Sequence, residues 1–277
     1  SMDLGQIDLE IENEKFFKNE ILLDHIRDIK KRNGRAHLMS LFSDGGVHGH
    51  INHLIASIRL FQSHNIPIIL HLITDGRDVA PKSAIEFVDK IRPVISDEVQ
   101  VGTVIGRYYS MDRDNRWERV ELAYNALVFG NSKQKTSNIE MAITKAYDSG
   151  ISDEFILPTV INQYSGIREN DGFFCLNFRA DRARQVLKAI GDPNFSEFKI
   201  ENRPQIINLL GMVEYSANHN TFMSTCYPKQ KIKNTLGEWV SLAKKTQFRL
   251  AETEKYPHVT FFLNGGNEEP LSGEFRK

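Results

Sequence analysis

The sequence predicts an α/β fold in which helices flank a largely parallel β-sheet. Short apolar runs rich in β-branched residues alternate with segments whose apolar residues recur at helical spacing. The run IPIILHLI at 66–73 has almost no polar residue, as expected of a strand that is covered on both faces. Such alternation over most of the 277 residues is typical of parallel sheets whose crossovers are helices.

The first half of the chain carries three strand patterns and three helix patterns. The segment 16–33 predicts a helix that ends before Gly34, and its apolar face is formed by Ile21, Leu22, Ile26 and Ile29. Ser83 is placed to cap a helix whose apolar residues are Ile85, Phe87, Val88 and Ile91. The predicted strands are 36–42, 66–73 and 99–105, and the remaining predicted helix is 50–61.

The second half continues the alternation and adds signals for helix ends. Asn115 with Glu118, and Ser137 with Glu140, have the spacing of a capping box, each before a helical pattern. Gly150 is placed to close the second of these helices. Further strands are predicted at 172–178, 205–212, 248–252 and 258–264, and further helices at 184–190 and 235–244.

The composition excludes some classes of protein. Thirty-five Lys and Arg against 36 Asp and Glu give a formal net charge of −1, which argues against a general polyanion binder, so we expect no nucleic-acid partner. Cys175, in the apolar run GFFCLNF, is predicted to be a buried thiol, and with Cys226 it forms no disulfide pattern, which favours a reducing cytoplasm. No apolar run is long enough to cross a bilayer, and Ser1-Met2 is typical of a cloning scar.

Polar residues collect directly after the predicted strands. The five loops read SDGGVHGH, TDGRD, GRYYSMDRD, RADRAR and ETEKYPH. In open parallel sheets, ligands bind outside the carboxyl ends of the strands, so we expect these loops to converge on one crevice. They offer a set of cationic groups: His48, Arg77, Arg107, Arg113, Arg179, Arg182 and Lys255. Because the planar fork of arginine suits carboxylate and phosphate, the set predicts a ligand with more than one anionic group.

Several of these residues also have a simpler interpretation. Arg107 and Arg113 could be solvated loop charges or partners of Asp112 and Asp114. The DGRD segment could be an ordinary turn before Pro81, although Asp78 is placed to accept a ligand hydroxyl or to transfer a proton. Two arginines beside Asp181 at a predicted helix start oppose the helix dipole, and a bound anion explains them better.

Two other kinds of site remain open at this stage. His48, His50 and His53 have the spacing H-x-H-x-x-H, which is compatible with a zinc site, although no cysteine pair accompanies them. Tyr108, Tyr109 and Trp117 beside the arginines are compatible with a module that binds single-stranded nucleic acid or another anion. The sequence shows no serine-hydrolase elbow, no P-loop, and no carboxylate cluster of the kind that Mg²⁺ or Mn²⁺ prefers, so we assign no metal ligand to this chain.

Five motifs together resemble a known family. SDGGVHGH, DGRD, GRYYSMDRDNRWERVELAY, NFRADRAR and AETEKYPHVTFFLNGG, in this order, are similar to segments of the cofactor-independent phosphoglycerate mutases. These enzymes interconvert 3- and 2-phosphoglycerate in glycolysis without 2,3-bisphosphoglycerate. The likeness extends from about residue 3 to the end of the chain. It implies an isomerase with two domains: a phosphatase-like domain with two Mn²⁺ (or Mg²⁺ or Co²⁺) ions and a serine that becomes phosphorylated, and an inserted phosphotransferase domain that holds the glycerate.

The resemblance places this chain in the inserted domain and its flanks. It implies a phosphotransferase domain over 3–234, and over 235–277 the end of that domain with a hinge towards the phosphatase-like domain. Substrate contacts are implied for His48, Arg77, Asp78, Arg107, Arg113, Arg179, Arg182 and Lys255, with Asp78 as candidate general acid/base. Gly49 departs from the family pattern, in which a small hydroxyl residue is usual. Since the serine segment would precede residue 3 and most metal ligands would follow residue 277, we expect the chain alone to be inactive, cytoplasmic and monomeric.

Overall fold

The structure is a computed structural model that describes residues 2–206, 208–229, 232–253 and 255–277. It divides the chain into two compact units, residues 1–228 and 229–277. The first unit contains the large sheet and most of the helices, and the second contains a small two-stranded sheet.

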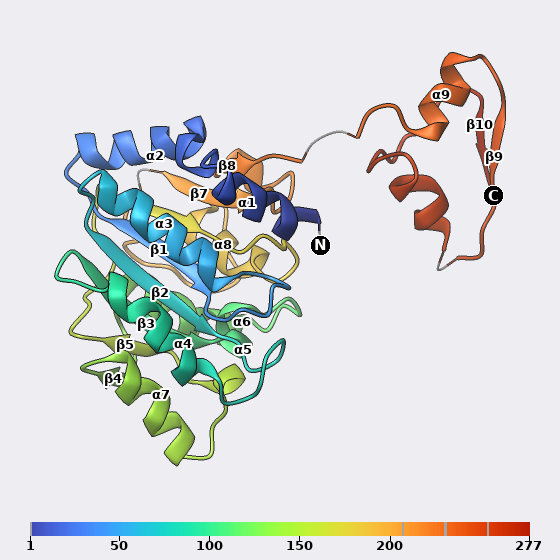
Figure 1. The fold of residues 1–277 in the computed structure, drawn as a ribbon. Helices are drawn as coiled ribbons and strands as arrows, with labels where there is room; N and C mark the ends of the chain where they lie inside the picture. Colours follow the sequence, from blue (N-terminus) through green and yellow to red (C-terminus); the bar gives the residue numbers. More distant parts are fainter. Residues whose placement is uncertain (1, 207, 230–231, 254) are drawn as a thin grey trace. The chain divides into compact units, whose positions relative to one another are not determined.

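An eight-stranded, mostly parallel sheet forms the centre of the first unit (Figure 1). Its strand order is β4-β5-β3-β2-β1-β6-β7-β8, and the single antiparallel pairing between neighbours is β3 with β5. The strands are β1 Ala36–Leu41, β2 Ile68–Thr74, β3 Val99–Gly106, β4 Gln134–Thr136, β5 Thr159–Ile161, β6 Gly172–Cys175, β7 Leu209–Val213 and β8 Ser224–Tyr227. The predicted α/β class with a largely parallel sheet is therefore confirmed.

Helices cover both faces of this sheet. Figure 1 shows α2 and α3 on the near face, and α6 and α8 behind the sheet. The helices of the first unit are α1 Met2–Glu12, α2 Glu20–Lys31, α3 Ile51–Ser63, α4 Ala84–Ile91, α5 Arg107–Ser110, α6 Trp117–Phe129, α7 Ile139–Asp148 and α8 Arg184–Gly191. Short 3₁₀ turns are η1 Phe16–Lys18, η2 Arg92–Val94, η3 Asp153–Phe155 and η4 His219–Thr221. Because both faces are covered, every residue of β1 and of β2 is buried.

The parallel order brings four strand ends to one edge of the sheet. β3, β2, β1 and β6 are consecutive neighbours and run in the same direction. The loops that begin at Phe42, Asp75, Arg107 and Leu176 therefore leave the sheet side by side. This confirms the predicted convergence for four of the five loops, whereas the fifth strand, β9 Gln247–Arg249, belongs to the small sheet of the second unit and not to the large one.

A row of buried polar side chains crosses three strands of the large sheet. His37 Nδ1 lies 2.9 Å from His71 Nε2, and His71 Nδ1 lies 2.9 Å from the hydroxyl of Thr103. His37 Nε2 lies 2.8 Å from Asp171 Oδ2, and Asp171 also pairs with Arg35. Burial lowers the pKa of both histidines, so they are neutral at pH 7 and hold complementary tautomers along the row.

Three predicted side-chain caps are wrong, although each helix begins one or two residues after the predicted capping residue. Ser83 makes no side-chain cap; Asp153 Oδ2, from another segment, accepts the backbone N–H of Ser83 and of Ala84 at 2.8 and 2.9 Å. Asn115 takes a left-handed φ of 57°, and α6 begins after Arg116 without a side-chain cap. α7 is capped by Asn138, whose side chain accepts the N–H of Met141 at 2.8 Å, and not by Ser137. Spacing alone does not determine which polar side chain reaches the free N–H groups.

Other elements of the first unit differ in length from the prediction. The helix predicted at 16–33 divides into η1 and α2, because Asn19 caps α2 through the N–H of Leu22, and Ile21 is exposed rather than on the apolar face. The strands predicted at 172–178 and 205–212 shorten to β6 and to β7, with residue 207 outside the described residues. The pattern did not predict α1, where Ile7 is the one fully buried apolar side chain among the described residues of the helix. Gly150, at φ 75°, ends α7 as predicted.

The second unit contains one wrong prediction. Its elements are α9 Leu236–Leu242, β9, the π-helical turn η5 His258–Phe262, and β10 Glu274–Arg276, which pairs with β9 in parallel. The strand predicted at 258–264 is thus a helical turn, because an apolar run of this length does not distinguish strand from helix. α9 starts with a capping box between Thr235 and Glu238, in agreement with the helix predicted there.

Candidate anion-binding site

Asp75 holds the turn that carries two of the predicted site residues. Its Oδ1 accepts the backbone N–H of Arg77 at 3.2 Å and of Asp78 at 3.0 Å, and its Oδ2 accepts the hydroxyl of Ser43 at 2.6 Å. Gly76 has a φ of 63°, a conformation that glycine adopts without strain. DGRD is therefore a turn, as the simpler interpretation has it, and the same turn presents Arg77 and Asp78 at the strand edge.

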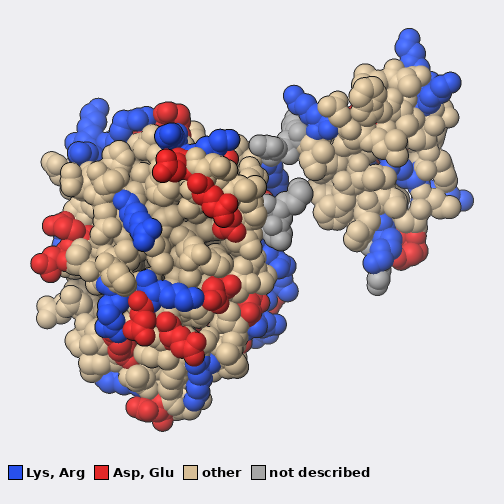
Figure 2. Space-filling model, viewed as in Figure 1, with Lys and Arg blue, Asp and Glu red and all other residues tan. Residues whose placement is uncertain are grey.

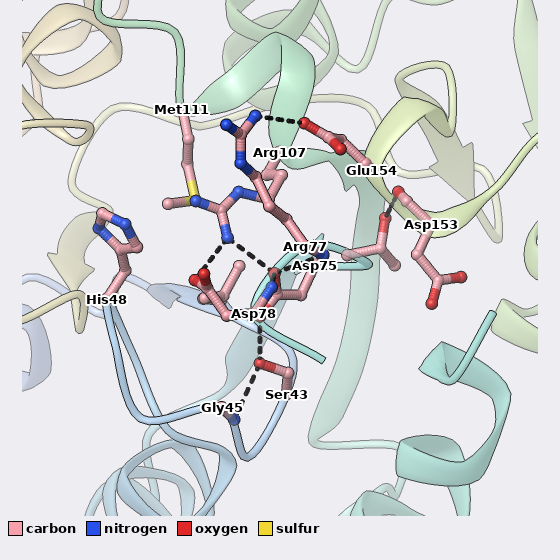
Figure 3. A network of polar contacts seen from close by, with 12 residues as sticks. Ser43, Gly45, His48, Asp75, Arg77, Asp78, Arg107, Met111, Asp153 and Glu154 are labelled. Carbon is pink, nitrogen blue, oxygen red and sulfur yellow. Dashed lines mark hydrogen bonds and ion pairs between the residues drawn. The ribbon is translucent and has the colours of Figure 1, made fainter. Parts of the chain in front are cut away.

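Arg107 is a buried cation between two carboxylates (Figure 3). It begins α5, is 3% exposed, and donates from Nη1 to Asp75 Oδ1 and to Asp78 Oδ2, each at 2.7 Å. Burial acts to lower the pKa of Arg107, and the hydrogen bonds to Asp78 and Asp75 outweigh it. Burial acts to raise the pKa of Asp75, and the hydrogen bonds from Ser43, the Asp78 backbone and Arg107 together hold it below its usual value. Arg107 is thus fixed in place, with partners other than Asp112 and Asp114.

His48 lies at the same edge and is a neutral group. Its side chain is almost fully buried, and Nδ1 has no hydrogen-bond partner among the described residues. Burial, followed by the charge of Arg107, lowers the pKa of His48 to about 4. The sequence placed His48 among the cations of the crevice; at neutral pH it supplies instead an uncharged nitrogen that can donate or accept.

Arg113 and Arg179 meet at the carboxylate of Asp181. Arg113 Nη1 donates to Asp181 Oδ2 at 2.8 Å, and Arg179 Nε lies 3.1 Å from Oδ1. His48 Nδ1 lies 3.7 Å from the same Oδ1. Three side chains from three different strand-end loops thus surround a single anionic group, which shows that these loops can present a common binding position.

Arg182 lies among other arginines of the crevice. Its Nη1 donates to the carbonyl of Met111 at 3.3 Å. The pKa of Arg182 is lowered first by burial, then by the positive charges of Arg113, Arg107 and Arg77, with Asp181 acting in the opposite direction. Nearby positive charges that destabilise one another in this way favour binding of an anion.

The two remaining predicted residues are placed differently. Arg77 points to Glu154, with Nη1 3.2 Å from Oε1, and is mostly exposed (Figure 3). Lys255 belongs to the second unit, where its backbone N–H bonds the carbonyl of Glu252 and its side chain is exposed. Its assignment to the same crevice stays a prediction.

Sequence reasoning missed three polar residues that organise the crevice. Asp75 and Asp181 were treated as parts of a turn and of a helix start. In the structure Asp181 pairs with two arginines, and Asp75 pairs with one arginine and with the backbone of its turn. Asn177 accepts the backbone N–H of Leu41 at 2.9 Å and so joins the ends of β1 and β6. The signal was present, since all three lie within the quoted loops or directly before one.

Gly49 occupies a narrow space beside Asn177. A Cβ added to Gly49 would stand 2.9 Å from Asn177 Oδ1 and 3.0 Å from Leu41 Cβ. A residue larger than glycine at this position would require a small shift of Asn177, whereas glycine fits the observed loop as it is. The departure from the family pattern therefore falls at a sterically tight position.

The three histidines of the zinc interpretation do not face one centre. His50 Nδ1 caps α3 by accepting the N–H of Asn52, and His53 Nε2 lies 2.7 Å from Asp8. Within the described ranges, no three His, Cys, Asp or Glu side chains form a group that could hold a metal ion. The zinc interpretation is therefore wrong for these residues.

The aromatic residues of the nucleic-acid interpretation are partly buried and contact other side chains. The guanidinium of Arg119 lies 3.7 Å from the ring centre of Tyr108, and Trp117 packs against Phe195. On the face of the first unit that Figure 2 shows, acidic and basic side chains alternate without a continuous basic area. No helix among the described residues is long and apolar enough to cross a membrane.

A separate cavity lies at the opposite end of the sheet and does not belong to the crevice. It measures about 240 Å³ and is bordered by Val88, Ile91 and Ile139, near the amino end of β3. Its one arginine, Arg92, is already paired with Asp89 and Glu140. This cavity is therefore separate from the strand-end arginines.

Fold and site together define an α/β domain with a cluster of arginines at the carboxyl ends of its parallel strands, where such folds bind ligands and where the charge suits an anion. The family described as BPG-independent PGAM N-terminus, that is, the 2,3-bisphosphoglycerate-independent phosphoglycerate mutases, matches residues 7–217. The chain belongs to this family.

Individual relatives agree with this assignment. Proteins named 2,3-bisphosphoglycerate-independent phosphoglycerate mutase from a Ruegeria species and from Agrobacterium fabrum are 55% and 56% identical over 276 residues. A solved structure of Leishmania mexicana phosphoglycerate mutase at low cobalt concentration matches with a TM-score of 0.79 and 26% identity, over 99% of this chain and 53% of that chain. The alignments cover 54% of each curated relative, so the chain spans about half the length of the relatives it matches.

Proposed function

We propose that this chain is the substrate-binding half of a phosphoglycerate mutase and that its crevice binds 3- and 2-phosphoglycerate. The observation that carries the proposal is the convergence of Arg113, Arg179 and His48 from three strand-end loops on one carboxylate position. A phosphoryl or carboxylate group of the ligand offers the same kind of acceptor oxygen, and arginine binds such groups through paired hydrogen bonds. Membership of the family supports this choice of ligand.

In this proposal the side chains divide into a clamp and a proton-transfer group. Arg77, Arg113, Arg179 and Arg182 bind the carboxylate and phosphate of the ligand, and the same role for Lys255 stays a prediction from the family resemblance. Arg107 is held rigidly by Asp75 and positions Asp78. Asp78 contacts the glycerate hydroxyls and is the candidate general acid/base for the hydroxyl that gives or receives the phosphoryl group. The chain supplies orientation and electrostatic stabilisation.

The phosphoserine and the metal site of the reaction would lie in the remaining length of the complete protein. Two Mn²⁺ ions, or Mg²⁺ or Co²⁺, would stabilise charge on the transferred phosphoryl group there. The described residues of this chain do not fit such a group, since they contain no cluster of three potential ligands. We therefore assign to this chain no step that passes through the metal.

The second unit offers a surface that fits contact with that remaining length. Of its 49 residues, a large share of the apolar ones is exposed: Ile232, Leu236, Trp239, Leu242, Phe248, Leu250, Phe262, Leu263 and Phe275. Exposed large apolar side chains in this number are typical of a unit that is covered by another part of a protein. We propose that the phosphatase-like part of the same polypeptide covers it, in a cytoplasmic monomer. The buried free thiols Cys175 and Cys226 are compatible with a reducing compartment.

Ligand binding by the purified chain tests the proposal. We expect ¹H–¹⁵N NMR titration with 3-phosphoglycerate to show weak binding, and Arg179→Ala to weaken it at least tenfold, because hydrogen bonds to charged groups contribute about 1.5–3 kcal/mol. Arg92→Ala is the matched control, since Arg92 is exposed and lies at the opposite end of the sheet. Unchanged affinity in Arg179→Ala would refute the clamp.

Activity measurements test the division of labour. The chain alone, with added Mn²⁺ and free of host enzyme, should not convert 3-phosphoglycerate. Turnover that follows this chain through purification would show that the nucleophile lies within these 277 residues.

A further inference from the structure

Asp181 occupies the centre of the clamp, although it has the same charge as the ligand that the clamp is proposed to bind. It lies in the loop between β6 and α8, and its two oxygens face Arg113, Arg179 and His48. A carboxylate at this position forms ion pairs with the same cations that a bound anionic ligand would contact.

The contacts of Asp181 are incomplete in a way that points to exchange. Oδ2 accepts a hydrogen bond from Arg113, whereas the buried Oδ1 has no hydrogen-bond partner of good geometry among the described residues. His48 Nδ1, 3.7 Å from Oδ1, is also buried and without a partner. Because an ionised Oδ1 only accepts and no atom fits between the two, an oxygen of an incoming anion can bind only by taking the place of Oδ1, where it accepts from His48 Nδ1 in its Nδ1–H tautomer.

Asp181 is also free to leave. Its side chain is 29% exposed, while Arg113 and Arg179 are about half-exposed, so the carboxylate can rotate into water without the cost of a buried charge. Burial acts to raise the pKa of Asp181, but the hydrogen bond from Arg113 and the positive charge of Arg179 outweigh it and lower the pKa, so the group is ionised at neutral pH.

We propose that Asp181 is an internal competitor of the anionic ligand: its carboxylate holds Arg113 and Arg179 in the binding arrangement and is displaced when the ligand binds. This proposal rests on the proposed function and adds to it a residue that limits affinity. No covalent bond changes, and one anion replaces another at the same guanidinium groups. The benefit is that the arginines stay arranged in the free protein, and the cost is a weaker apparent affinity, since only the open fraction is competent to bind.

Competition predicts an unusual direction of effect. Asp181→Asn should bind anions about three- to tenfold more tightly than wild type, because two partly exposed ion pairs, each of modest strength, no longer hold the closed state. The gain should be the same for any anion at this position, since every ligand requires the same opening. A general charge effect differs, because deleting a negative charge near the site would favour a dianion more than a monoanion.

The test is NMR titration of the whole chain with inorganic phosphate and, separately, with acetate at pH 7.5. The variants are Asp181→Asn, Arg179→Ala and, as a matched loss of a carboxylate beside another crevice arginine, Glu154→Gln. The proposal predicts an equal gain for both anions in Asp181→Asn, and a smaller gain in Glu154→Gln.

Each other result overturns a defined statement. If Asp181→Asn binds anions no more tightly than wild type while Arg179→Ala binds them more weakly, Asp181 is not a competitor, and the proposed function still holds. A gain for phosphate that clearly exceeds the gain for acetate reduces Asp181 to a background charge. Absence of anion binding in wild type and in every variant contradicts the proposed function and the competitor together.

Discussion

Replacing Asp75 with asparagine tests the central feature of the crevice, the buried pair that fixes Arg107. Asp75 and Arg107 are 1% and 3% exposed, and their charged atoms are 2.7 Å apart. Removing one partner of a buried ion pair costs about 3–5 kcal/mol. Because Asp78 still accepts from the same nitrogen of Arg107, we expect a loss of about 3 kcal/mol for Asp75→Asn.

Urea unfolding followed by far-UV circular dichroism measures this loss, provided that the slope of free energy against urea is the same for both proteins. Asp44→Asn is the matched control. Asp44 lies in the neighbouring loop and pairs with Lys90 at 3.0 Å, with 45% and 46% of the two side chains exposed. Such pairs contribute about 0–1 kcal/mol. A loss below about 1 kcal/mol in Asp75→Asn, or one no larger than in Asp44→Asn, would refute the rigid anchoring of Arg107.

Three further predictions concern the scaffold. Asn138→Ala should cost about 1 kcal/mol and Ser137→Ala almost nothing in urea unfolding, since Asn138 caps α7; the reverse order would restore the cap predicted from spacing. Burial acts to raise the pKa of Asp171, but hydrogen bonds from His37 and Arg35 hold that pKa far below its usual value. The stability that the ionised Asp171 contributes is therefore complete above about pH 4 and is lost as the pH falls further. Asp171→Asn should therefore be less stable at pH 7 and show a flatter decline below pH 4, and parallel curves would contradict this. Burial raises the pKa of Cys175 to about 11, so a thiol reagent at pH 8 should label it in urea and not in the native protein; rapid native labelling would contradict its burial.

The fold class could be predicted because its signal is distributed along the chain. Buried parallel strands must be apolar on both faces, and β1, β2 and β3 match the predicted segments to within two residues at each end. The short strands β4, β5 and β8 gave no such signal, because three or four residues carry too little pattern. The run at 258–264 failed for a related reason, since its apolar residues satisfy a helical turn as well as a strand.

Helix ends were predicted less well because capping depends on tertiary contacts. Asp153 lies about seventy positions from the helix start that it caps, at Ser83 and Ala84, and no local spacing rule includes it. Where the cap is local and both partners are adjacent in the fold, as in Thr235 and Glu238, the predicted helix start holds.

The sequence predicted which side chains of the candidate site lie near one another, but not how they pair. Strand-end loops identify which side chains share an edge, because topology determines where each loop begins. They do not determine which carboxylate neutralises which arginine: Arg107 selected Asp75 and Asp78 over the sequence neighbours Asp112 and Asp114. That choice matters for the site, because the buried Arg107 holds Asp78 through a hydrogen bond, while the substrate contact of Arg107 that the family resemblance implies stays a prediction. Arg113 and Arg179 are partly exposed by contrast, and they share the carboxylate of Asp181, which is itself partly exposed to water.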